Sequence, residues 1–118
     1  IFCDKLNQLD VNQRGKEVRF LNEFNPKGIN VTFVEINKDF LFIRTYERGV
    51  DAETLSCGTG AVAAVISAYI RGYISVTSIS VKTNGGILGV SFNVKNNKFT
   101  NIYLSSRIEK VFEGNITK

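Results

Sequence analysis

The feature that most constrains the fold is a run of small and apolar residues from Gly58 to Ile70, interrupted only by Thr59 and Ser67. The run predicts a helix that is apolar on nearly every face, and such a helix is buried inside a domain rather than lying on its surface. It is far shorter than the ~20 residues needed to cross a bilayer. We therefore expect the rest of the chain to wrap around this helix, which Arg71-Gly72 would end.

The composition is that of one ordinary soluble globular domain, with 118 residues of which 43% are hydrophobic and 22% charged. Fifteen basic and 11 acidic residues leave a net charge of +4. Because there is no histidine, this chain holds no Ser-His-Asp triad, imidazole zinc site or histidine base. Cys3 and Cys57 are too far apart in sequence to form a metal knuckle and too few for a disulfide framework, so a reducing compartment and no metal are expected.

The remaining patterns predict an α+β fold of mostly antiparallel strands wrapped around the one buried central helix. Asp10 is a plausible cap for a helix whose apolar spacing continues to Phe24. Asn37-Lys38-Asp39 reads as a hairpin turn. Seven or so strands are expected, at Ile1, Ile29–Ile36, Phe40–Tyr46, Thr77–Lys82, Leu88–Val94, Phe99–Leu104 and Lys110–Ile116.

The segment from Glu47 to Gly60 carries the candidate chemistry because it delivers Cys57 to the start of the apolar helix. The first turn of a helix has unpaired N–H groups and the positive end of the macrodipole, so it favours a thiolate or a substrate carboxylate. Glu47 and Arg48 read equally well as a solvated ion pair or as ligands of a substrate ammonium and carboxylate. Cys3, flanked by Ile1, Phe2 and Asp4 in an expected strand, is expected to be a small hydrophobe.

Four motifs in this order resemble the C-terminal half of diaminopimelate epimerase, and the resemblance covers nearly all of the chain. They are Asn30-x-x-Phe33, Glu47-Arg48-Gly49, Cys57-Gly58-Thr59-Gly60 and Val111-Phe112-Glu113-Gly114. One departure is an extra residue between Glu47 and Cys57. Loops absorb such insertions at little cost, but the conformation of this loop is left open.

The resemblance implies a cofactor-independent isomerase that interconverts LL- and meso-diaminopimelate by proton transfer between two cysteines, in lysine and cell-wall precursor biosynthesis. It implies that Cys57 is one catalytic acid/base. Glu47 would meet a substrate amine and tune the protonation of the thiols. The other substrate-binding residues implied are Asn30 and Arg48 for the distal carboxylate and Gly58 and Thr59 for the reacting carboxylate.

The resemblance also implies that residues 1–118 are a single domain, the C-terminal half of a longer chain whose N-terminal half is absent. The second cysteine would lie in that half, so this segment alone is expected to be inactive. The expected partners are the small-molecule substrate and the missing half, with a homodimer left open, and neither nucleic acid nor membrane. The expected compartment is the cytoplasm.

Two alternatives stay open. One is a proline or hydroxyproline racemase-like isomerase of the same fold, for which Arg48 would have no second carboxylate to bind. The other is a non-catalytic module that binds nucleic acid, suggested by the pI near 9.2, although the cationic residues form no stripe. A phenazine-biosynthesis-type isomerase shares the architecture but does not rely on this thiol.

Overall fold

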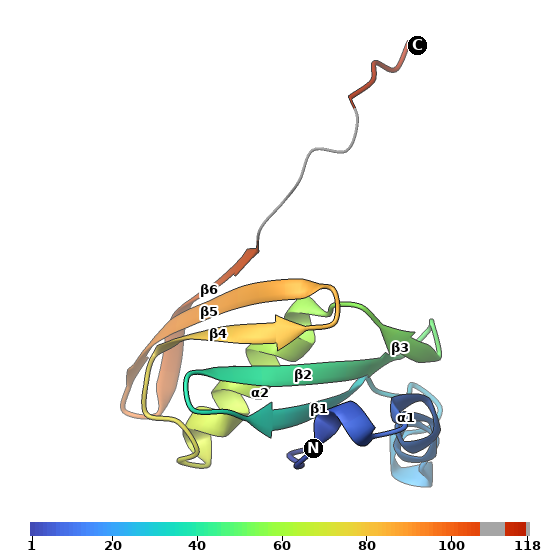
Figure 1. The fold of residues 1–118 in the computed structure, drawn as a ribbon, viewed down its shortest axis with the longest axis horizontal. Coiled ribbons are helices and arrows are strands. Elements are labelled where there is room, and N and C mark those ends of the chain that lie inside the picture. Colours follow the sequence, from blue (N-terminus) through green and yellow to red (C-terminus); the bar gives the residue numbers. More distant parts are fainter. Residues whose placement is uncertain (107–112, 118) are drawn as a thin grey trace.

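Six strands form one mixed sheet in the computed structural model, which describes residues 1–106 and 113–117. Their spatial order is β1-β2-β4-β5-β6, and β3 pairs with β2 off this path (Figure 1). All neighbours are antiparallel except β2 and β4, which run parallel. The strands are β1 (Val31–Ile36), β2 (Phe40–Glu47), β3 (Ala52–Thr54), β4 (Ser78–Thr83), β5 (Gly86–Lys95) and β6 (Lys98–Ser106).

Helix α2 (Gly58–Ile70) lies against one face of this sheet and forms the main core with it (Figure 1). Its small residues allow a close approach to the strands. The buried residues of this core are Val34, Leu41, Ile43, Ala61, Ala64, Val65, Ala68, Ile79, Val81, Leu88, Val90 and Phe92. The predicted bounds of the helix and the α+β class with mostly antiparallel strands are confirmed.

Helix α1 (Val11–Arg19) and the short 3₁₀ turn η1 (Leu6–Gln8) cover the opposite face of β1 and β2. A second cluster forms there from Leu6, Val11, Val31, Phe33 and Tyr46. Successive residues of a strand point to opposite faces, so β1 places Phe33 in this cluster and Val34 in the core with α2. These two strands are therefore buried on both sides at their centre.

Several local predictions hold. Asp10 caps α1 by accepting a hydrogen bond from the Gln13 N–H at 3.1 Å. Gly15 lies inside that helix because a Cβ there would overlap the side chain of Tyr46. The hairpin at residues 37–39 joins β1 to β2, with the Asn37 N–H donating to the Phe40 carbonyl at 3.0 Å.

Other predictions need correction. The first helix ends at Arg19 rather than Phe24, and a separate 3₁₀ turn, η2, spans Asn22–Phe24. Phe20 and Leu21 are each 45% exposed. Burial of these side chains therefore does not stabilise a longer helix. The chain start contributes an isolated bridge, Phe2 to Val34, in place of a strand. Strand β3 was not expected, because its residues Ala52-Glu53-Thr54 have no strand pattern.

The closing segment is only partly described. Of the expected strand Lys110–Ile116 and the motif Val111–Gly114, residues 110–112 lie outside the described residues. Residues 113–117 are described and belong to no strand. The strand prediction is therefore wrong for Glu113 to Ile116 and stays a prediction for the rest.

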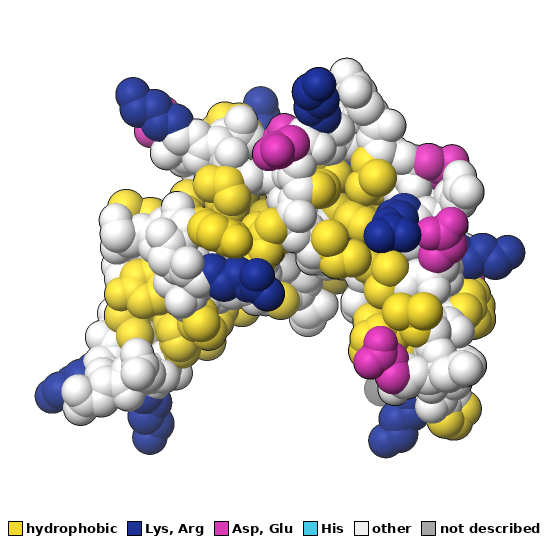
Figure 2. Space-filling model, turned by 90° about the horizontal axis from the view of Figure 1, so that it is seen from below, with side chains coloured by type: hydrophobic (Ala, Val, Ile, Leu, Met, Phe, Trp, Pro, Cys, Tyr) yellow, Lys and Arg dark blue, Asp and Glu magenta, His cyan; other side chains and the backbone are white. Residues whose placement is uncertain are grey.

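The helix α2 is covered on one side only, against the expectation that strands would surround it. Thr59, Ala63, Ser67 and Ile70 form an exposed stripe along it, because the sheet reaches around only the opposite face. Seen from below Figure 1, the molecule is hollowed between two lobes that both show hydrophobic side chains, while the Lys and Arg side chains stand apart from one another (Figure 2). No helix among residues 1–106 and 113–117 is long and apolar enough to cross a membrane.

Candidate active site

Cys57 is the N-cap residue of α2. Its backbone is extended, with φ −141° and ψ 108°, and its sulfur accepts a hydrogen bond from the Gly60 N–H at 3.4 Å. Ser, Thr, Asp and Asn are the usual N-caps because an oxygen accepts this bond, so here a thiol stands in for an oxygen. The thiol is therefore held against the positive end of the helix dipole, where the sequence predicted it.

The surroundings of the sulfur are polar although the residue is only 8% exposed. The Thr59 hydroxyl lies 3.4 Å from Sγ. The N–H groups of Gly58 and Thr59 have no hydrogen-bond partner among the described residues. This first turn therefore combines a weakly exposed thiol, a hydroxyl and two free donors, which suits an anionic group.

Gly60 lets α2 approach the sheet at the level of the thiol. A Cβ on Gly60 would lie 2.7 Å from Thr32 Oγ1, 3.2 Å from Thr45 Oγ1 and 3.3 Å from Cys57 Sγ. The hydroxyls of Thr32 and Thr45 lie 3.1 Å apart and share a hydrogen bond. This threonine pair is not among the residues predicted from the sequence. The available signal was a polar residue on the helix-facing side of each of two adjacent apolar strands.

Asn30 and Arg48 are brought together from positions 18 apart in the chain. The Arg48 N–H donates to Asn30 Oδ1 at 2.8 Å, and Arg48 Nη1 donates to the Lys27 carbonyl at 3.2 Å. Both residues are exposed. Asn30 also lines a groove of about 210 Å³ between the start of the chain and the exposed stripe of α2, with Thr32, Ala63 and Ser67 among its other lining residues.

The loop after Glu47 accommodates the extra residue in a tight turn. The Asp51 N–H donates to the Glu47 carbonyl at 2.7 Å, and both Gly49 and Asp51 have positive φ. The Asp51 carboxylate pairs with Arg19 at 2.9 Å, which ties the loop to the end of α1. Glu47 is half-buried, and among the described residues no hydrogen bond joins its carboxylate to Cys57.

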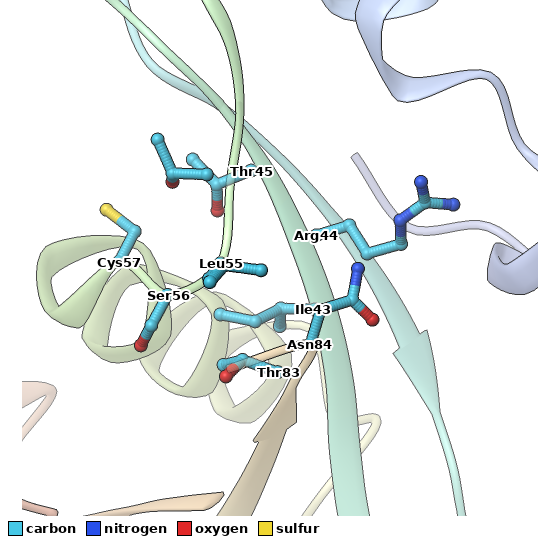
Figure 3. A pocket seen from close by; sticks show the side chains of 9 residues that line it. Ile43, Arg44, Thr45, Leu55, Ser56, Cys57, Thr83 and Asn84 are labelled. Carbon is cyan, nitrogen blue, oxygen red and sulfur yellow. The ribbon is translucent and has the colours of Figure 1, made fainter. Parts of the chain in front are cut away.

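A small pocket lies beside Cys57, behind the segment that leads into α2 (Figure 3). In Figure 3 the Cys57 sulfur points away from Ile43 and Thr83. The space is too narrow to admit a water molecule. It is a packing gap and not a substrate site, although the Thr54 hydroxyl is buried beside it without a partner among the described residues. The pocket is lined by Ile43, Arg44, Thr45, Thr54, Leu55, Ser56, Cys57, Thr83 and Asn84.

An ion pair outside the predicted set lies near the site. Arg44 and Glu53 form a forked pair with two N···O distances of 2.6 Å, and both side chains are largely buried. Hydrogen bonding to Glu53 raises the pKa of Arg44, with burial opposing this. No pattern in the sequence pointed to this pair. Within residues 1–106 and 113–117, no three His, Cys, Asp or Glu side chains gather where they could hold a metal.

Comparisons with known proteins agree with the motifs. Over 98% of this chain, the sequence is 44% identical to the diaminopimelate epimerase of Flavobacterium psychrophilum and 38% identical to that of Aquifex aeolicus. The chain spans only 45% and 41% of those two proteins.

The fold is also similar to solved structures. A phenazine biosynthesis protein of Clostridium difficile matches with a TM-score of 0.57 at 22% identity, covering 76% of this chain and 31% of that one. A PhzF family protein of Bacillus anthracis matches with a TM-score of 0.55 at 21% identity, covering 74% of this chain and 26% of that one. At this identity the likeness concerns the fold alone. The diaminopimelate epimerase family model matches residues 1–110, so this chain belongs to the diaminopimelate epimerase family.

Proposed function

We propose that this chain is the C-terminal half of an epimerase that interconverts LL- and meso-diaminopimelate, and that Cys57 is one of its two acid/base groups. The observation that carries the proposal is the Cys57 thiol at the N-terminus of α2, where it accepts from the Gly60 N–H in a chain of this family. The proposed setting is lysine and cell-wall precursor biosynthesis in the cytoplasm.

The proposed reaction removes one proton from the α-carbon and adds another on the opposite face. A thiolate takes the α-proton, so the C–H bond breaks, an S–H bond forms and the electron pair stays on the α-carbon. A thiol on the opposite face then donates its proton to that carbon, which inverts the centre. Cys57 serves one face, and the second thiol comes from the half of the protein outside this chain.

The N–H groups of Gly58 and Thr59, which have no partner among the described residues, are suited to hold the reacting carboxylate. Charge that develops on this carboxylate during proton removal would be stabilised by donors already in place, which is the largest electrostatic contribution in many enzymes. Exclusion of water would strengthen the effect. No cofactor enters this proposal.

The remaining assigned residues would select the substrate. Asn30 and Arg48 are exposed and lie together where β1 begins and β2 ends, and we assign them to the distal carboxylate. Glu47, at the end of β2, is assigned to a substrate ammonium and to tuning the thiols. A substrate with one carboxylate, such as proline, would leave Arg48 without a role.

The test is α-hydrogen exchange in deuterated water by the full-length protein, with diaminopimelate and proline as substrates. We expect deuterium at the α-carbon of diaminopimelate and none in proline. Arg48→Gln should raise KM at least tenfold, whereas Arg14→Gln, which changes an exposed arginine in a surface pair, should not. If only proline exchanges its α-hydrogen, the racemase-like alternative is favoured. If neither substrate exchanges its α-hydrogen, the proposal is overturned.

A further inference from the structure

A dense network of hydrogen bonds joins strands β2 and β3, neither of which carries Cys57. Arg44 of β2 donates through Nε and Nη2 to the two carboxylate oxygens of Glu53 in β3, both at 2.6 Å. Its Nη1 donates to the carbonyls of Leu6 and Leu9 at 2.8 and 2.9 Å. All three guanidinium nitrogens are therefore used, and the fork geometry allows Glu53 little freedom to shift.

The same network reaches the segment that leads into α2. Glu53 Oε2 also accepts from Asn84 Nδ2 at 3.3 Å, and the Glu53 N–H donates to Asn12 Oδ1 at 2.7 Å. Next to Asn84, the Gly85 N–H donates to the Leu55 carbonyl at 2.8 Å. Residues 53–55 are thus fixed by β2, by α1 and by the turn between β4 and β5, and one residue, Ser56, separates them from Cys57.

We propose that Glu53 is a positioning residue for Cys57, acting through the backbone of residues 53–56; the inference rests on the proposed acid/base role of Cys57. Arg44 and Glu53 lie on the α1 side of the sheet and the thiol lies on the α2 side, so the carboxylate fixes the segment without touching the substrate. A shift of about 1 Å in a reacting group can cost about 10²-fold in rate. A network that prevents such a shift would therefore act on catalysis and not only on stability.

The decisive variant is Glu53→Gln in the full-length protein, which removes the charge and places an amide against Arg44. Its matched control is Glu17→Gln, since Glu17 also pairs with an arginine, Arg14, at 3.0 Å but on an exposed helix face. Asn84→Ala removes one hydrogen bond at an exposed position. It serves as a milder second variant that should fold whatever happens to Glu53→Gln.

Two readouts separate positioning from general stabilisation. Peptide mass spectrometry gives the alkylation rates of Cys57 and Cys3 in the same sample. Because Cys57 is only 8% exposed, we expect Glu53→Gln to speed its alkylation several-fold at alkaline pH and to leave Cys3 unchanged. The kcat of α-hydrogen exchange should fall roughly 10- to 100-fold with KM within about threefold. Asn84→Ala should show smaller changes in the same directions.

Alkylation and kcat equal to those of Glu17→Gln would overturn the proposal. A parallel rise at Cys3 and Cys57 would also overturn it, because the pair would then be a general stabiliser. If the parent protein exchanges no amino acid, the proposed function fails. The alkylation comparison then still decides whether Glu53 positions Cys57.

Discussion

The two cysteines of this chain occupy contrasting regions. Cys57 caps a 13-residue helix, accepts a backbone hydrogen bond and is 8% exposed. Cys3 is half-buried beside the outer edge of β1, where its N–H donates to the Val34 carbonyl at 2.9 Å. Burial raises the pKa of the Cys3 thiol above its usual value. The Cys57 thiol faces the N-terminus of a helix, whereas the Cys3 thiol is held in its neutral form by burial.

The comparison teaches that the immediate surroundings distinguish the two thiols. Free N–H groups of a first helical turn favour an anion. Desolvation is the largest influence on Cys3 and disfavours an anion there. The N-terminal ammonium and a backbone hydrogen bond with Val34 oppose this rise in pKa, and the Glu35 and Asp4 carboxylates reinforce it. The following changes would break or sharpen this contrast.

The largest effect is expected from removing each thiol in turn in the full-length protein. Cys57→Ser should lower the kcat of diaminopimelate α-hydrogen exchange by roughly 10²- to 10⁴-fold, the contribution of a positioned acid/base group. Cys3→Ser should leave kcat within about twofold. If both variants exchange the α-hydrogen of diaminopimelate at the wild-type rate, Cys57 has only a packing role and the assigned acid/base role is wrong.

The next effect tests the close approach of α2 to the sheet. Gly60→Ala in the 118-residue chain should destabilise it by about 1–3 kcal/mol, measured by urea unfolding. The new Cβ would lie 2.7 Å from Thr32 Oγ1. The clash must also outweigh the gain of up to about 1 kcal/mol that alanine brings to a helix.

A second substitution tests whether the clash is the cause. Thr32→Ala removes the nearest atom and, on its own, should cost about 0.5–1.5 kcal/mol through the lost hydroxyl pair. Combined with Gly60→Ala, it should give a double variant that is more stable than the sum of the two losses predicts. Strict additivity would show that the helix has moved away from the threonines.

The smallest effect concerns pH. Since the pKa of Cys3 is raised in the folded chain, its neutral form contributes stability below its ordinary value of 9.0. That contribution is lost as pH rises through the higher folded value. Between 9.0 and this folded value, wild type should therefore lose stability more steeply than Cys3→Ser, as followed by urea unfolding at a series of alkaline pH values. Parallel curves would mean that the folded and unfolded thiols titrate alike.

Much of the local structure was readable from the sequence. Helix α2 begins and ends where its apolar run does, and Asp10 caps α1, because capping and side-chain periodicity act over a few residues. The helix predicted beyond Arg19 does not form, for a tertiary reason: Leu21 fits the helical spacing but its side chain packs into no core. The position of Cys57 at a helix start was likewise predictable, whereas its catalytic role stays a prediction.

The contacts that hold the site could not be read in this way. In the sequence, Glu53 is one charged residue in a segment that contains several glycines. In the structure, its carboxylate accepts hydrogen bonds from Arg44, nine positions earlier, and from Asn84, 31 positions later. Thr32 and Thr45 are likewise ordinary strand residues until β1 and β2 pair and α2 crosses them. Partners so far apart in sequence leave no periodic signal.

By itself, the sequence determined the helix that presents Cys57, the alternation of the strands and the family motifs, because each depends on residues close together in the chain. Only the tertiary structure decided which polar groups meet across β1, β2, β3 and the β4–β5 turn, and which face of α2 remains uncovered. The physical reason is that the geometry of a buried hydrogen bond depends on the packing of whole elements, and packing sums contributions from the entire chain.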